Sequence, residues 1–353
     1  MTTVSMLGAG VMASALSFPL SDNGHEVRLV GTHLDREIID RIREDGVHPN
    51  LKRKLPDGVA AYQLEEAEEA FAGAGVVMSG VNSFGVRWAG ERLADLLQPG
   101  TPVLSVTKGL EADENGDLRA LPDVLAEQVP ADVREGVTWS AIAGPSIAGE
   151  VAARRQSCVV FTGRDAEVLE QLARLFRTDY YHAWTSDDFV GVEVCAAMKN
   201  CYALGVGFGR GVLERQGEGE SPDRNHNYEA ALFGQASVEM SRMTDLLGGR
   251  PETPGGLAGV GDMYVTSAGG RNVRVGRLVG GGLRFSEARE KMAGVTLEGA
   301  AAIEVVGGAL QPLTDRGVIE PSDFPLMRHL HAVVAKDEPL DMPWEKFFGG
   351  SRF

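Results

Sequence analysis

The start of the chain combines a strand, a glycine turn and a helix in immediate succession. Thr3–Leu7 is rich in β-favouring residues, and the glycine turn at residues 8–10 opens an apolar helical pattern. Glu26–Val30 then predicts a second strand. These elements within about thirty residues form the context that a dinucleotide-binding fingerprint requires. The chain is therefore expected to begin with an α/β domain. The alternative interpretation of the glycine pattern is a tight turn that binds no ligand.

The glycine turn also predicts where a pyrophosphate would bind. Gly8 permits the tight turn, Gly10 lets the backbone approach the pyrophosphate, and Ala13 stands where the pattern allows a third glycine. The N-terminus of the following helix supplies free N–H groups and the positive end of a dipole for the anion.

The segment after the second strand bears on the choice between NAD and NADP. No acidic residue directly follows Val30, where it would accept the ribose hydroxyls, and Asp35 is expected on the next helix. Thr32, His33 and Arg36 could instead accommodate a 2′-phosphate. The segment therefore leans toward NADP. The alternative is that these side chains face solvent and NAD binds through other contacts.

The rest of the first half repeats strand and helix units. Alternation of this kind predicts a Rossmann-like, doubly wound and mostly parallel sheet. Strand C-termini in such sheets face the ligand crevice, so Lys108 at the end of one strand would point into the site. Further strands are predicted at 76–81, 103–106, 138–143, 157–162 and 180–184, and helices at 87–97 and 166–176.

The second half shows helical periodicity only. We therefore expect a dinucleotide-binding domain at 1–186 and an all-α substrate-binding domain at 187–353. The polar, acidic stretch 214–226 is expected to be a loop that acts as a lid, a specificity wall or a disordered insertion. Helices are predicted at 189–213, 228–247, 271–279, 285–292 and 297–310.

Charge and cysteine content limit the partners and the compartment. A formal charge of −16 disfavours nucleic acid and anionic membranes, and no stretch is expected to reach the length of a membrane-spanning helix. The three cysteines form no Cys-x-x-Cys pair, which favours reduced thiols and a cytoplasmic location. We expect His329 and His331 to be an exposed helical pair and expect no metal site.

Lys199 interrupts a helix-length apolar run at residues 194–206. A lysine in such a run is costly unless it snorkels to the surface, is paired or stays neutral. Burial also lowers the pKa of a lysine, which is one way in which enzymes obtain an amine that exchanges protons near neutral pH. The run alone leaves both a snorkelling lysine and a catalytic lysine open.

A second polar stretch lies at residues 259–272. Glycines before Asp262 indicate a backbone held close to another group, and Asp262 and Thr266 would share a helix face. Arg271 and Asn272 follow two glycines, as in an anion clamp that opens a helix. The alternative is a helix-capping aspartate beside a surface arginine.

Together these motifs resemble those of the NAD(P)-dependent sn-glycerol-3-phosphate dehydrogenases, especially the bacterial soluble type. The resemblance extends over nearly the whole chain. The matching landmarks are Gly8-x-Gly10-x-x-Ala13-Ser14, Thr107-Lys108-Gly109-Leu110, Gly144-Pro145-Ser146-x-Ala148-x-Glu150, Met198-Lys199-Asn200, Gly259-x-Gly261-Asp262-x-x-x-Thr266, Gly270-Arg271-Asn272 and Leu297-Glu298-Gly299.

The resemblance implies a role for each matched position. Lys199 would be the general acid that protonates the carbonyl oxygen as hydride arrives, and the base in the reverse direction, while Lys108 would polarise that oxygen or hold substrate. Asp262 and Thr266 would orient Lys199. The family further implies NADP or NAD, a small phosphorylated polyol or ketose as substrate, and a homodimer. Implied substrate-binding residues are Arg271, Asn272, Lys108 and Asn200, and implied cofactor-binding residues are Gly8, Gly10, Val11, Met12, Ala13, Thr32, His33, Arg36, Ser83, Lys108, Ala148, Arg271 and Glu298.

The chain departs from the family pattern at four places. An insertion precedes Asn227, Glu229 stands where a basic residue is usual, and residues 233–235 replace a small or basic motif. Asn82 also replaces a proline. The first three changes add acidity on the expected substrate side. A different polyol phosphate or a secondary-metabolite precursor is therefore an alternative substrate.

Two further functions compete with this one. A β-hydroxyacid or 6-phosphogluconate-type dehydrogenase shares the architecture and the lysine–asparagine pair, but the motifs around Lys108 and Arg271 argue against it. A catalytically silent dinucleotide-binding sensor or scaffold is the other alternative. A silent protein would have no need to retain Lys108, Lys199, Asp262, Thr266, Arg271 and Asn272 together.

Overall fold

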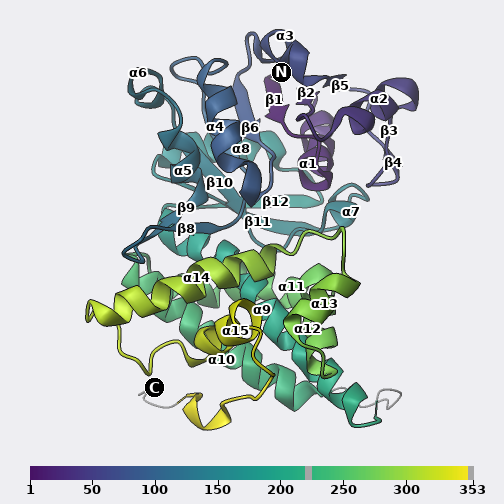
Figure 1. The fold of residues 1–353 in the computed structure, drawn as a ribbon. Helices are drawn as coiled ribbons and strands as arrows, with labels where there is room; N and C mark the ends of the chain where they lie inside the picture. Colours follow the sequence, from purple (N-terminus) through teal and green to yellow (C-terminus); the bar gives the residue numbers. More distant parts are fainter. Residues whose placement is uncertain (219–224, 349–353) are drawn as a thin grey trace. The chain divides into compact units, whose positions relative to one another are not determined.

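The computed structural model describes residues 1–218 and 225–348. The chain forms two compact units, one of residues 1–108 with 121–192 and the other of residues 109–120 with 193–353. The elements of both units are labelled in Figure 1.

The first unit is built on one eight-stranded sheet in the order β12-β11-β10-β7-β6-β1-β2-β5. Every neighbouring pair is parallel except β10 and β11. The predicted doubly wound, mostly parallel sheet is thereby confirmed. The strands are β1 Thr3–Leu7, β2 Glu26–Val30, β5 Val59–Tyr62, β6 Val76–Ser79, β7 Val103–Ser105, β10 Trp139–Ala143, β11 Ser157–Gly163 and β12 Tyr181–Ser186.

Helices cover both faces of this sheet, as Figure 1 shows. One buried apolar cluster joins the sheet to α1, α2, α7 and α8, and a second joins it to α3, α4 and α5. Apolar residues on both faces explain why the central strands are continuous apolar runs. The helices are α1 Val11–Asp22, α2 Arg36–Asp45, α3 Ala67–Phe71, α4 Val86–Ala94, α5 Leu121–Glu127, α6 Ala131–Arg134, α7 Ala148–Val151 and α8 Ala166–Phe176.

Several short elements of this unit escaped the sequence prediction. The edge strand β5 has only four residues, and the hairpin of β3 (Val47–His48) and β4 (Arg53–Lys54) has two residues in each strand. Strands of this length are too short to show a period-two pattern. The 3-10 turns are η1 Leu64–Glu66 and η2 Ser83–Gly85.

The second unit is helical, as predicted. A helix at α15 was predicted only as the setting of His329 and His331, without bounds, although its apolar positions recur at helical spacing. The elements are α9 Phe189–Arg215, α10 His226–Leu246, η3 Thr253–Gly255, the π-helical turn η4 Leu257–Gly261, α11 Asp262–Ser267, α12 Arg271–Gly280, α13 Phe285–Lys291, α14 Glu298–Asp315, α15 Pro325–Ala335 and η5 Trp344–Lys346.

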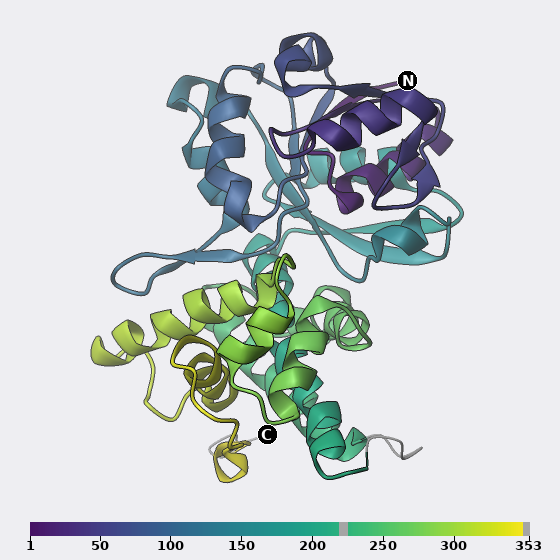
Figure 2. The ribbon, with the colours of Figure 1, turned by 45° about the vertical axis from the view of Figure 1, so that its right-hand side comes forward.

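A β-hairpin from the middle of the first half belongs to the helical unit. Its strands are β8 Leu110–Ala112 and β9 Leu118–Ala120, and β8 contacts α14 (Figure 2). Arg316 at the end of α14 donates to a carboxylate oxygen of Asp117 at 2.8 Å. A Cβ at Gly116 would lie 2.7 Å from the carbonyl oxygen of Ala309, so the hairpin approaches α14 at backbone distance.

Helix α9 corrects one expectation about length. It is long and apolar enough to cross a membrane by length and composition, whereas no stretch was expected to be. The helix itself was predicted at 189–213, with an apolar run at 194–206 that Lys199 and Asn200 interrupt. Within its apolar window 89% of the residues are buried inside the protein, and the core helix of a globular domain passes the same test.

The structure differs from two more expectations, one about a loop and one about a histidine pair. The expected loop 214–226 begins later, because α9 continues to Arg215 and Glu214 pairs with Arg277 of α12; residues 219–224 lie outside the described residues. His329 and His331 lie on α15 and are half-buried rather than exposed. Burial lowers the pKa of both imidazoles.

Reciprocal glycines bring α9 and α12 into backbone contact. Gly207 and Gly211 lie one turn apart on α9, and Gly276 and Gly280 lie one turn apart on α12. A Cβ at Gly276 would lie 2.0 Å from the carbonyl oxygen of Leu204, and a Cβ at Gly211 would lie 2.0 Å from a carbonyl oxygen of α12. Only glycine permits this approach, which places the N-terminus of α12 beside the Lys199 segment of α9.

We therefore predict that Gly276→Ala lowers the free energy of unfolding by about 1–3 kcal/mol or more, because the added methyl overpacks a backbone contact. Gly308→Ala is the matched control. Gly308 also lies within a helix, but the nearest atom to an added Cβ is 3.8 Å away, so this change should stabilise by about 0.5–1 kcal/mol. Urea denaturation measures both, and equal effects would contradict the close helix contact.

Candidate active site

The glycine turn between β1 and α1 has the geometry that a dinucleotide requires. Gly8 has a φ of +110°, and a Cβ there would lie 2.9 Å from the backbone of Gly80. The nearest atom to a Cβ at Gly10 is 3.7 Å away, which leaves space for a pyrophosphate to approach the backbone. The first turn of α1 carries Val11, Met12 and Ala13, without an acidic residue or a side-chain cap. Its N–H groups can therefore serve an anion.

Asp35 corrects the expectation for the end of β2. It lies directly before α2, but its carboxylate turns back toward the glycine turn. The Oδ2 atom accepts from the backbone N–H of Ala9 at 3.2 Å and from that of Thr32 at 2.9 Å. A Cβ at Gly31 would lie 3.3 Å from the Asp35 side chain, so the glycine leaves room for this turn. No acidic side chain was expected from the sequence next to the cofactor turn, but the Asp35 carboxylate lies beside the glycine turn between β1 and α1.

The three candidate 2′-phosphate residues have other contacts. The Thr32 hydroxyl donates to Asp35 Oδ2 at 2.8 Å. The ring of His33 packs edge-on against Trp88, with 5.3 Å between the ring centroids. Arg36 pairs with Glu65 at 2.5 Å, and both side chains are more than half exposed. A surface pair of this kind is weak, so Arg36 remains able to exchange its partner.

His48 supports the glycine turn and was missed in the sequence analysis. Its imidazole is fully buried, with Nε2 2.9 Å from the carbonyl oxygen of Ala9, and its Nδ1 accepts from the N–H of Leu51. The β3–β4 hairpin that carries it is too short to give a periodic signal. The sequence shows only a histidine followed by Pro49, and its burial is known from the structure.

Three predicted residues follow the carboxyl ends of neighbouring strands. Ser83 opens η2 after β6, Lys108 follows β7, and Ala148 opens α7 after β10. Lys108 donates from Nζ to the carbonyl oxygen of Gly144 at 3.4 Å. Because β7 pairs with both β6 and β10, these residues and the glycine turn lie along one edge of the sheet. The first unit thereby provides a continuous nucleotide-binding edge.

In the helical unit, Lys199 of α9 forms a buried ion pair with Asp262 of α11. The Lys199 side chain is 9% exposed and that of Asp262 is 1% exposed. This geometry excludes the snorkelling alternative, because the ammonium ends at a carboxylate within the protein. Both groups also have interactions other than this bond. Paired burial holds a charged amine at a fixed place, which a proton donor requires.

The backbone before α11 places Asp262. The π-helical turn η4 ends at Gly261, and π turns often occur at functional sites. A Cβ at Gly259 would lie 2.1 Å from the carbonyl oxygen of Pro254, which accounts for the glycine there. The Thr266 hydroxyl donates to the carbonyl oxygen of Asp262 at 2.7 Å. Thr266 thus contacts the backbone of Asp262 rather than its carboxylate.

Two asparagines join α9, α12 and α14. Asn272 donates from Nδ2 to Oδ1 of Asn200 at 3.2 Å, and its Oδ1 accepts from the N–H of Gly299 at 3.1 Å. A Cβ at Gly299 would lie 2.5 Å from the carbonyl oxygen of Asn200, so this junction also needs a glycine. Asn200 is the neighbour of Lys199, so the junction holds the start of α12 and of α14 beside the ion pair.

Arg271 and Glu298 complete this cluster. They stand at the first positions of α12 and α14, with 3.8 Å between the guanidinium and the carboxylate. The Arg271 side chain is 51% exposed, so its charge is available to an anion at the surface of the cluster. The helical unit therefore gathers Lys199, Asn200, Asp262, Thr266, Arg271, Asn272 and Glu298 in one place.

Two of the residues that depart from the family pattern, Glu229 and Gln235, lie on α10. Glu229 packs against Gly209, which is ten residues beyond Lys199 on α9 or about 15 Å along the helix axis. Gln235 accepts from the N–H of Phe348 at 3.0 Å. Glu229 thus contacts the far end of α9 and Gln235 the C-terminal segment, while residues 219–224 of the insertion lie outside the described residues. The expectation that these changes add acidity beside the substrate stays a prediction.

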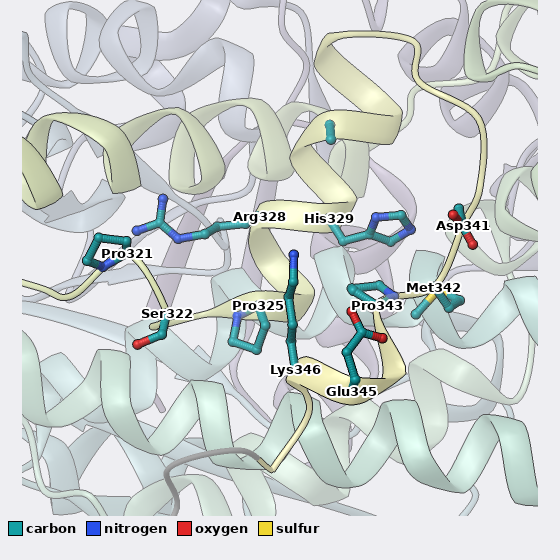
Figure 3. A pocket seen from close by; sticks show the side chains of 11 residues that line it. Pro321, Ser322, Pro325, Arg328, His329, Asp341, Met342, Pro343, Glu345 and Lys346 are labelled. Carbon is teal, nitrogen blue, oxygen red and sulfur yellow. The ribbon is translucent and has the colours of Figure 1, made fainter.

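A cavity of about 810 Å³ opens between α15 and that C-terminal segment (Figure 3). None of the predicted site residues lines it. Basic and acidic side chains are mixed in its wall, and among the described residues no group of three histidine, cysteine or acidic side chains could hold a metal ion. The lining residues are Pro321, Ser322, Pro325, Arg328, His329, Ala332, Asp341, Met342, Pro343, Glu345 and Lys346.

Comparison with known proteins matches both units. Residues 3–169 match the family described as the NAD-dependent glycerol-3-phosphate dehydrogenase N-terminus, and residues 188–345 match the corresponding C-terminus. The NADP(+)-dependent glycerol-3-phosphate dehydrogenase of Archaeoglobus fulgidus is 37% identical over 289 residues, covering 82% of this chain and 83% of that protein. Glycerol-3-phosphate dehydrogenase [NAD(P)+] of Shouchella clausii is 31% identical over 95% of this chain and 92% of its own.

A solved structure shows the same architecture. The crystal structure of glycerol-3-phosphate dehydrogenase from Coxiella burnetii superimposes with a TM-score of 0.78 at 27% identity, covering 96% of each chain. The similarity thus extends over both units and is not confined to the widespread nucleotide-binding fold.

The position of Asp35 generates a test of cofactor discrimination. Asp35→Asn removes a negative charge beside the expected ribose site but retains an acceptor oxygen for Ala9 and Thr32. We expect the ratio of kcat/KM for NADPH to that for NADH to rise about tenfold, the effect of about 1.4 kcal/mol of removed repulsion. Glu44→Gln on the exposed end of α2 is the control with the same charge change. An unchanged ratio in Asp35→Asn would show that the carboxylate does not face the 2′ position.

Proposed function

This chain belongs to the NAD-dependent glycerol-3-phosphate dehydrogenase family, and on that basis we propose that Lys199 is its general acid and base. The protein is an NAD(P)-dependent oxidoreductase that interconverts sn-glycerol 3-phosphate and dihydroxyacetone phosphate. The observation that carries the proposal is the buried Lys199–Asp262 ion pair.

Lys199 can perform both directions of the proton transfer. In the reduction, its ammonium stabilises the alkoxide that develops at the carbonyl oxygen and then gives that oxygen a proton from Nζ. In the oxidation, the neutral amine takes the hydroxyl proton back. Asp262 orients the amine and balances its charge in the ammonium state. Lys108, which follows β7, is proposed to polarise the carbonyl oxygen or to hold substrate.

The first unit fits a nicotinamide dinucleotide. Residues 8–13 supply a glycine turn and helix N–H groups for its pyrophosphate, and Ser83 and Ala148 follow the neighbouring strands. When bound, the nicotinamide ring supplies or accepts the hydride. The cofactor is NADP or NAD. Thr32, His33 and Arg36 favour NADP in our proposal, while the Asp35 carboxylate opposes a 2′-phosphate.

Arg271 is the proposed ligand of the substrate phosphate. Its loose pairing with Glu298 leaves the guanidinium exposed, and a phosphate dianion offers it a stronger, bidentate partner. Asn200 and Asn272 are further proposed substrate ligands. The hydrogen bond between their side chains leaves only the remaining amide atoms for binding substrate. Glu298, which faces Arg271 across 3.8 Å, is kept as a proposed cofactor contact. We further propose residues 1–186 and 187–353 as nucleotide and substrate domains, a homodimer, and a cytoplasmic location.

We predict that the protein oxidises NADPH or NADH in the presence of dihydroxyacetone phosphate, followed by the loss of nicotinamide absorbance. Turnover on another phosphorylated ketose alone would point to the alternative of a different polyol phosphate. Activity on a β-hydroxyacid or on 6-phosphogluconate would favour that class of dehydrogenase instead. Cofactor binding without turnover on any of these substrates would support the silent sensor or scaffold.

Replacement of Lys199 tests its role directly. Lys199→Ala should lower kcat by about 10²- to 10⁴-fold, the usual contribution of a general acid, while NADPH binding by fluorescence stays within about twofold. Lys291→Ala removes an exposed lysine from α13 and should leave kcat unchanged. Circular dichroism must show that Lys199→Ala is folded, because Asp262 is left without this lysine. Normal turnover in a folded Lys199→Ala protein would refute the proposed mechanism.

A further inference from the structure

A buried carboxylate on α10 collects hydrogen bonds from three helices. Glu239 is fully buried, and its Oε2 accepts from the Tyr202 hydroxyl of α9 at 2.9 Å and from the N–H of Met327 at 2.9 Å. Its Oε1 accepts from Nε2 of Gln235 at 2.8 Å and from the N–H of Leu326 at 2.7 Å. Four donors around one carboxylate satisfy the ionised form.

The surroundings of Glu239 are built to hold it. Leu326 and Met327 are in the first turn of α15, where free N–H groups favour a negative charge. Phe324, directly before that helix, adopts a left-handed φ of 59°, a conformation that a phenylalanine keeps only where its surroundings demand it. Burial raises the pKa of Glu239, and the four hydrogen bonds oppose that rise. A carboxylate in a core is expensive unless other groups compensate it; Glu239 has these four hydrogen bonds and a favourable Coulombic interaction with Arg328 of α15.

The bond from Tyr202 ties α10 to the helix of the proposed proton donor. Tyr202 is fully buried and follows Lys199 by three residues, less than one turn of α9. Gln235 donates to the same carboxylate over a similar distance, but it comes from α10 itself, four residues before Glu239. Of these two side chains, only Tyr202 bridges α9 and α10.

The other side of α10 contacts the segment that carries Asp262. Helix α10 packs against η3 and η4, and η4 runs directly into α11 at Asp262. The Ser241 hydroxyl of α10 donates to the carbonyl oxygen of Pro251, just before η3. Helix α10 thus contacts both the helix that carries Lys199 and the turn that carries Asp262.

We propose that Glu239 is a positioning residue for the Lys199–Asp262 pair and acts through Tyr202. This inference rests on the proposed role of Lys199. The Tyr202–Glu239 bond sets the rotation and height of α9 against α10, and α10 in turn locates η4. Loss of the bond lets the two halves of the ion pair shift relative to each other. A proton donor displaced by a fraction of an ångström loses catalytic efficiency without losing its substrate contacts.

The test compares Tyr202→Phe with Gln235→Met. Each removes one hydrogen bond to Glu239 at nearly constant volume, but only Tyr202→Phe cuts the link between α9 and α10. We expect Tyr202→Phe to lower kcat about tenfold with the KM for the phosphorylated substrate within twofold, and Gln235→Met to keep both within twofold. Equal losses of kcat in the two variants, or no loss in either, would overturn the proposal.

A second readout does not depend on turnover. The rate at which acetic anhydride acetylates Lys199, followed by peptide mass spectrometry with the exposed Lys291 as internal reference, reports how firmly the ion pair is held. Acetylation should be faster in Tyr202→Phe than in the wild type and unchanged in Gln235→Met. If the wild type lacks turnover, the proposed function fails while this measurement still decides the positioning role. Should Tyr202→Phe not fold, Glu239→Gln replaces it, with the same expected increase; an unchanged rate would refute the proposal.

Discussion

The buried ion pair between Lys199 and Asp262 is the contact on which the helical unit depends. A lysine in the middle of an apolar helix costs several kcal/mol unless a carboxylate meets it, and that carboxylate must arrive from another element. The structure supplies Asp262 from the end of a π-helical turn. The pair converts an unfavourable residue into a fixed proton donor, and it commits α9 and α11 to one relative position.

Several other contacts in the helical unit hold α9 and its neighbouring helices in fixed relative positions. Glycines at 207, 211, 276 and 280 let α12 approach α9 at backbone distance, and Gly299 does the same for α14. Asn272 joins those two helices to Asn200 beside the lysine. Glu239 adds a connection from α10 through Tyr202. These close glycine contacts and side-chain hydrogen bonds restrict how the helices can shift, and they thereby fix the positions of Lys199 and Asp262.

The nucleotide unit shows a different balance between backbone and side chains. Its glycine turn is set by φ and by close backbone contacts, which allow few alternatives. The cofactor-discriminating side chains are held by exposed or shared bonds: Arg36 with Glu65, and Thr32 with Asp35. Binding of the common part of the dinucleotide is therefore built into the fold, while the preference for one phosphate depends on a few surface contacts.

Local patterns predicted most of the fold. Strands β1 and β2 and helix α8 have the predicted bounds, because apolar period and turn residues agree there. Short elements such as β5, the β3–β4 hairpin and the β8–β9 hairpin were missed, since two to four residues carry no readable period. The assignment of residues 109–120 to the helical unit could not be predicted either, because the contact of β8 with α14 joins distant parts of the chain and leaves no local sequence pattern.

The site divides along the same line. Lys199 was identified because a lysine is costly in an apolar run, whereas Asp262, Arg271 and Asn272 were identified by the glycines before them and by the family motifs. Their partners are properties of the folded chain: that Lys199 is paired, that Asn272 bridges two helices, that Asp35 turns back to Ala9, and that Glu239 holds Tyr202. Each of these contacts joins residues at least 26 positions apart in the chain. The sequence alone determines the residue types and the local periodicity of helices and strands. Which residues contact one another is decided by how those helices and strands pack in the folded chain.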